Sequence, residues 1–97
     1  MKTSTVIIKK DFKEDYISRE AGEKLRLMIL ENYKNNIITE IDFTDVIIAS
    51  TSFFDESIAK LALEEWSKEQ VDTFVLFKNI NKLDLDVLNK IREYRMI

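Results

Sequence analysis

The chain has 97 residues with 15 basic and 18 acidic side chains, so its net charge is −3 and it lacks the basic stretch that nucleic-acid binding requires. It has no cysteine and no histidine, which excludes thiol catalysis, disulfides and cysteine zinc sites and removes the commonest general base. Its apolar runs, such as residues 27–30, are far too short to span a membrane, and its N-terminus lacks a signal-peptide core. We therefore expect one soluble, cytoplasmic domain over residues 1–97, with no cofactor and no metal.

The first half of the chain predicts a strand, a helix and a second strand. Residues 3–9 are rich in β-branched side chains, which is typical of a strand. Ser18 opens a predicted helix that runs to about Asn35. The buried stripe of this helix includes the only glycine, Gly22, where we expect the helix to approach the sheet closely. After an asparagine turn, residues 37–43 alternate between apolar and polar side chains, which again predicts a strand.

The second half predicts a long helix, a buried strand and a last helix. The long helix covers residues 52–69, and residues 72–77 are apolar enough for a strand covered on both faces. A loop over 79–82 precedes a helix that Asp84 is expected to cap. The order βαβαβα predicts an α/β fold, with helices packed on a small, mostly parallel or mixed sheet of three to four strands. Sites in such sheets lie where strand ends lead into helix starts, here residues 49–56.

The start of the helix at residue 52 gathers hydroxyl, aromatic and acidic side chains. Ser52 and Asp55 fit a capping box, and Glu56 adds a second anion against the positive end of the helix. Helical projection places Phe53 on the outward face, and an exposed phenylalanine beside hydroxyl groups is typical of a docking surface. The alternative is that Phe53 packs beneath the preceding loop. The predicted partner contacts are Ser50, Phe53, Ser57 and Lys60.

The stretch "IDFTDVIIASTSFFDESIAKL", residues 41–61, resembles the STAS family, which includes anti-sigma-factor antagonists. It is most similar to a bacterial STAS-like group in which a strand ends in Asp-Phe and is followed by Ser-Phe-x-Asp-Glu. The matching residues are Asp42-Phe43 and residues 52–56, and "ISREAGEKLR" at 17–26 also resembles that group. The resemblance implies a STAS-like fold and a binding module.

The resemblance also points to a phosphorylation site. In the antagonist branch, an Asp-Ser-Ser-Gly motif ends the strand, and a partner kinase that is also the anti-sigma factor phosphorylates its first serine. Thr51 stands at that phosphoacceptor position, Ser50 replaces the aspartate, Ser52 is retained and Phe53 replaces the glycine. A phosphate on Thr51 or Ser52 would add a charge of about −1.5 to −2 and repel a partner packed there. The implied partner is a GHKL-type ATPase or kinase of the anti-sigma type.

Three functions stay open, and we favour the first. It is a non-catalytic regulatory module that docks a protein partner through the start of the second helix and is switched by Ser/Thr phosphorylation. The alternative is a self-associating homodimer without a phosphorylation cycle, with Phe53, Leu27 and Leu30 at its interface. The third is a small enzyme that uses paired carboxylates as acid and base, which requires burial to raise one pKa. Its candidate acids are Asp42, Asp55 and Glu56. No catalytic residue is assigned, because the chain has no histidine, no cysteine and no glycine loop.

Overall fold

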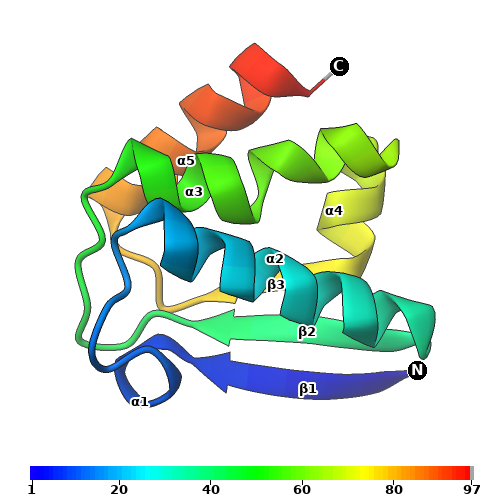
Figure 1. Cartoon of the computed structure of the whole chain (residues 1–97), viewed down its shortest axis with the longest axis horizontal. Coiled ribbons are helices and arrows are strands. Elements are labelled where there is room, and N and C mark those ends of the chain that lie inside the picture. The colour runs from blue at the N-terminus through cyan, green and yellow to red at the C-terminus, as the bar shows by residue number, and fades with distance from the viewer. Residues whose placement is uncertain (97) are drawn as a thin grey trace.

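A computed structural model of the chain describes residues 1–96, and Figure 1 shows how its elements are arranged. Strands and helices alternate along the chain, which confirms the predicted α/β class and the βαβαβα order. The strands are β1 (Lys2–Ile7), β2 (Ile37–Asp42) and β3 (Val75–Lys78). The helices are α1 (Ile8–Asp11), α2 (Arg19–Lys34), α3 (Thr51–Ser57), the 3₁₀ helix η1 (Ala59–Glu64), α4 (Lys68–Phe74) and α5 (Lys82–Arg95).

The three strands form one parallel sheet with β2 in the middle. Ile41 of β2 lies opposite Val6 of β1 and Phe77 of β3. The face that carries Val6 and Ile41 is buried, and the alternation predicted for 37–43 is confirmed by the burial of its odd-numbered positions 39, 41 and 43. Residues of the opposite face, such as Ile7 and Leu76, are exposed. The helices therefore cover one face of the sheet. The expectation that the third strand is covered on both faces is wrong.

The N-terminus of α2 follows the prediction. Ser18 is the N-cap, and its hydroxyl accepts a hydrogen bond from the backbone N–H of Ala21 at 3.1 Å. Gly22 is buried, as expected, but the element it approaches is α3 and not the sheet. A β-carbon at Gly22 would lie 2.7 Å from both the Phe53 carbonyl oxygen and the Glu56 Cβ. The missing side chain of Gly22 thus allows two helices to pack in close contact.

Helix α3 is the central element of the helical layer. It lies between α2 and α5 (Figure 1) and packs against both. Phe53 and Phe54 are fully buried in the core, where their rings make an edge-to-face contact with centroids 5.6 Å apart. On the sheet side, Phe43 packs against Phe54, and on the other side Phe12 packs against Phe53. A helix enclosed in this way has only its first turn available to solvent.

The second half of the chain differs from the prediction in its helices. The single helix expected over 52–69 is three pieces, because the backbone tightens after α3 into η1 and then reverses at Glu65, whose φ of 64° is left-handed. Ser67 then caps α4 by accepting from the N–H of Gln70. Because α4 runs on to Phe74, the strand predicted over 72–77 begins only at residue 75.

Candidate functional site

The candidate site is the start of α3, which follows the end of β2 through the loop of residues 43–50. Ser50 is the N-cap: its hydroxyl accepts from the Phe53 N–H at 3.3 Å and donates to the Ile17 carbonyl at 2.6 Å. The predicted capping box of Ser52 with Asp55 is therefore wrong, because the N-cap lies two residues earlier, at Ser50. The helix begins at Thr51, so Asp55 and Glu56 lie past its first turn and their carboxylates have other partners.

The loop before α3 is fixed by Asp84, a residue predicted only as a helix cap. The N-cap of α5 is Asn81, and the fully buried Asp84 carboxylate accepts from the N–H groups of Ile48 and Ala49 at 2.7 and 2.8 Å. The Asn81 side-chain amide donates to it as well, at 2.7 Å. Ala49 has a left-handed φ of 48°, which costs an L-residue roughly 1–2 kcal/mol. The hydrogen bonds to Asp84 offset this strain and position Ser50 for its role as the cap.

Two of the predicted partner contacts lie inside the protein. Phe53 has no exposed surface, because the side of α3 assigned to solvent by helical projection is covered by Phe12 and by α2. Ser57 is equally buried, and its hydroxyl donates to the Phe53 carbonyl at 2.7 Å. Both predictions of partner contact are wrong for that reason. The burial of Phe53 also removes the aromatic residue expected at a homodimer interface.

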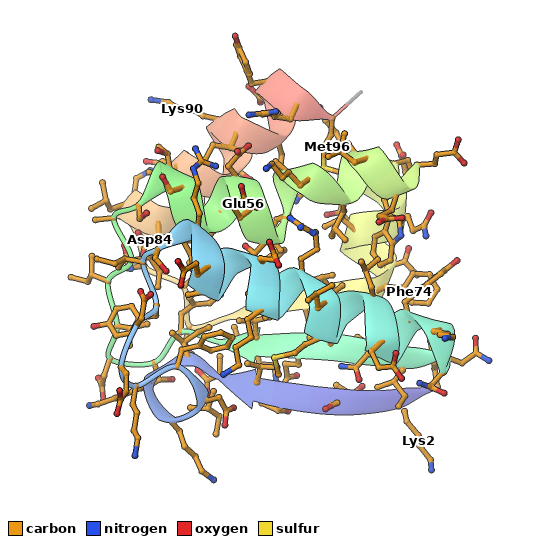
Figure 2. The ribbon with its side chains drawn as sticks, viewed as in Figure 1. Lys2, Glu56, Phe74, Asp84, Lys90 and Met96 are labelled. Atoms are coloured by element: carbon orange, nitrogen blue, oxygen red, sulfur yellow. The ribbon has the colours of Figure 1, made fainter. Side chains whose placement is uncertain are left out.

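The two buried acids of α3 form ion pairs with cations from three other segments, and these cations are only partly buried. Asp55 accepts a hydrogen bond from Arg19 Nη1 at 3.1 Å and from Arg95 Nη2 at 3.2 Å, and its other oxygen lies 2.9 Å from Arg95 Nε. Glu56 pairs with Arg19 at 3.0 Å, with Arg26 at 3.3 Å and with Lys60 at 2.6 Å. Figure 2 labels Glu56 on α3 beside α2. Lys60, predicted as a partner contact, is thus already engaged within the chain.

These ion pairs affect the proton equilibrium of Glu56. The hydrogen bond from Lys60, followed by those from Arg19 and Arg26, lowers the pKa of the Glu56 carboxyl from 4.5 to about 2 although burial opposes the change. The pKa of Asp42 is also lowered, chiefly by its hydrogen bond from the Thr44 hydroxyl. A carboxyl group that acts as a general acid at neutral pH needs a raised pKa, and these two are shifted the other way.

The phosphoacceptor candidates are the accessible part of the site. Thr51 is exposed and Ser52 is half-buried, while Ser50 is half-buried and engaged as the cap. Thr51 lines an open cavity of ≈ 370 Å³ between α2, α3 and α5. Arg19, Asp55 and Arg95 lie in the same cavity wall. Sequence reasoning found the two hydroxyls and missed the arginines, which come from helices on either side.

Within residues 1–96 no three acidic side chains gather closely enough to bind a metal ion. Over the same residues, no helix has the length and apolar character needed to cross a membrane.

A three-stranded parallel sheet with helices on one face and a fixed helix start beside it define the class of this protein as a small α/β domain. Residues 21–85 match the family described as a STAS-like domain of unknown function (DUF4325), and the chain belongs to that family. The resemblance drawn from the sequence is thereby confirmed. No curated protein and no solved structure matches the chain.

Proposed function

We propose that this STAS-like domain is a non-catalytic regulatory module that binds a protein partner through the exposed first turn of α3. The partner class is a GHKL-type ATPase or kinase of the anti-sigma type, as the resemblance to antagonist domains implies, and the compartment is the cytoplasm. With Phe53 buried, the contact surface consists of Thr51, Ser52 and the cavity wall next to them. The observation that carries the proposal is the exposure of Thr51 on a helix that is otherwise enclosed.

The rest of the site supports this role because side-chain contacts hold its backbone in place. Asp84 fixes the loop on one side of Thr51, and the ion pairs of Asp55 and Glu56 fix the helix on the other. A binding surface that is already in its bound shape loses little conformational entropy on association. Thr51 is therefore presented to a partner from a defined backbone position.

Phosphorylation of Thr51 or Ser52 is the proposed switch. The reaction transfers the γ-phosphoryl group of ATP to the hydroxyl oxygen, releases ADP and gives the hydroxyl proton to the kinase base. The product carries a charge of about −1.5 to −2 at the surface that the partner contacts. Arg19 and Arg95 line the same cavity, so the domain itself can accommodate the new charge while the bound partner meets an added anion.

Photo-crosslinking tests the docking surface directly. A photoreactive amino acid replaces Thr51 in one variant and the exposed Leu83 in a control, and both are expressed in cells and irradiated. We expect a discrete crosslinked adduct from position 51 that position 83 does not give. Mass spectrometry of the adduct then identifies the partner and its class. Equal crosslinking from both positions, or none from position 51, would refute docking at the start of α3.

Intact-mass analysis tests the switch. The purified chain is incubated with ATP and cell extract, and we expect one added phosphoryl group. The Thr51→Val and Ser52→Ala variants assign the modified residue, since one of them loses the mass increase. A mass increase that survives in the double variant places the phosphate elsewhere and removes the proposed switch.

A homodimer is a second candidate, favoured by one observation. Leu27 is 56% exposed on α2 and lines a cavity of ≈ 520 Å³ together with Met28. Contiguous exposed apolar surface marks interaction sites, and Leu27 with Met28 offers apolar surface at this hollow. Sedimentation velocity over a range of concentrations decides this: a dimer that dissociates in Leu27→Glu supports it, and a monomer throughout rules it out.

A further inference from the structure

The cavity beside Thr51 has a wall built from positive side chains of two helices. Arg19 comes from the start of α2, and Lys90 and Arg95 come from the second half of α5. We call this cavity, with its lining residues Arg19, Asp55, Lys90 and Arg95, the basic pocket. Figure 2 shows Lys90 extending from α5 away from the body of the molecule. These residues are far apart in the sequence, and the fold alone brings them together.

The basic pocket keeps an excess of positive charge after its internal ion pairs are counted. Its one lining acid, Asp55, is buried and held between Arg19 and Arg95, and Arg19 also pairs with Glu56 at 3.0 Å. Both arginine side chains are about half exposed, at 56% and 48%, so each has N–H donors that face solvent. The Lys90 ammonium has no carboxylate within 4 Å among residues 1–96. A chain with a net charge of −3 therefore has a local cationic hollow.

The same pocket offers apolar surface next to these charges. Ile91 is half-buried in the wall, and Tyr94, at 90% exposed, stands at the rim. An exposed tyrosine next to arginine is a common composition of protein interfaces. A ligand that fits both features has a negative group for the cations and an apolar group for Ile91 and Tyr94.

We infer that the basic pocket binds an acidic segment of the partner protein, in which a glutamate or aspartate side chain lies next to an apolar one. This inference rests on the proposed function and states the chemistry of the partner. The volume of ≈ 370 Å³ suits a few side chains of a peptide. Carboxylates are matched by the forked donors of Arg19 and Arg95. A nucleic acid is disfavoured, because its phosphates need a longer row of cations than one pocket and an acidic chain provide.

The probe is a short synthetic peptide rich in glutamate and carrying leucine, titrated into the ¹⁵N-labelled full chain and followed by NMR. We expect the amide signals of Thr51, Ile91 and Tyr94 to shift in a saturable manner that weakens as salt is added. The counterpart peptide with glutamine in place of glutamate should give no such shifts.

Charge reversal at Lys90 gives the matched comparison. Lys90 is exposed and has no carboxylate partner within residues 1–96, so Lys90→Glu should fold normally, which its own spectrum verifies. We expect it to weaken peptide binding about fivefold, the effect of replacing one attraction by a repulsion. Lys82→Glu, on the same helix but outside the pocket, should change the affinity less than about twofold.

Several results would overturn the inference. They are an absence of localised shifts, equal shifts with the glutamine peptide, an unchanged affinity in Lys90→Glu, and tighter binding of a single-stranded oligonucleotide in the same pocket. The crosslinking experiment keeps this outcome separate from the proposed function. If position 51 crosslinks a partner but the acidic peptide does not bind, the docking proposal is kept and the inference of an acidic ligand is refuted. If the peptide binds and position 51 gives no adduct, the basic pocket is shown to bind acidic peptides and the docking proposal is refuted.

Discussion

Replacing Gly22 with alanine tests the close contact between α2 and α3. The added methyl group would lie 2.7 Å from the Phe53 carbonyl oxygen and from the Glu56 Cβ, and 3.3 Å from the Ser57 nitrogen. Carbon atoms in proteins pack at about 3.5–4.0 Å, so α2 and α3 must separate by roughly 1 Å to admit it. Two of the three obstructing atoms belong to the backbone, and they cannot rotate away.

Two opposing terms set the magnitude. Alanine is the better helix former, by about 1 kcal/mol at an interior position. Inserting one carbon into a packed core costs about 1–3 kcal/mol, and an overlap with backbone atoms places this site near the upper limit. The net expectation is a loss of about 2 kcal/mol in the free energy of unfolding. For a chain of this size the melting temperature should fall by roughly 8–16 °C.

Urea unfolding measures this change through the fluorescence of the single, buried tryptophan, Trp66. The control is Glu23→Ala, the next residue on α2, whose side chain is exposed. It adds no atoms to the core and should alter stability by less than about 0.5 kcal/mol. A Gly22→Ala variant as stable as the wild type, or more stable, would show that the two helices are not in close contact and would refute the reasoning.

Three other predictions concern the residues that fix the start of α3. Asp84→Ala leaves the buried N–H of Ile48 and the partly buried N–H of Ala49 without their acceptor and should cost about 3 kcal/mol. Hydrogen exchange at those two amides should quicken, and protection at wild-type levels would contradict the loop contact. Ser50→Ala should cost about 1 kcal/mol and Ser52→Ala less than about 0.5 kcal/mol in urea unfolding, since only Ser50 caps the helix. A larger loss in Ser52→Ala than in Ser50→Ala would show that Ser52 is the cap after all. The pKa of Glu56 in the folded protein, about 2, lies below its ordinary 4.5. The stabilisation that the Glu56 carboxylate gives to the folded state is therefore complete above pH 4.5 and is lost as the pH falls toward 2. The acid limb of stability against pH should therefore be shallower in Glu56→Gln, and superimposable curves argue against the ion pairs.

Local patterns in the sequence predicted the elements whose structure depends on local signals. The alternation over 37–43 gave a strand with the correct buried face, and Ser18 marked the start of α2. Ser67 followed by Gln70 is also a local capping signal, and it would have shown that the helix predicted over 52–69 contains a second start. At Glu65 no glycine or proline marks the reversal, so nothing in the composition indicates it.

The errors at the candidate site have a different cause. Helical projection assigns one face to the core and one to solvent, but α3 is covered on both sides, so the outward position of Phe53 is as buried as the inward one. The arginines that pair with Asp55 lie 36 and 40 residues away along the chain. The Asp84 contact with the loop is equally distant. Such contacts depend on the tertiary arrangement and have no local signal.

The position of Asp84 has a consequence for biosynthesis. The loop of residues 43–50 leaves the ribosome well before residue 84, which holds its amides in place. During translation the loop lacks its hydrogen bonds to Asp84 until α5 has begun to emerge. In a nascent chain the three strands can therefore pair before the loop in front of Thr51 is held by Asp84.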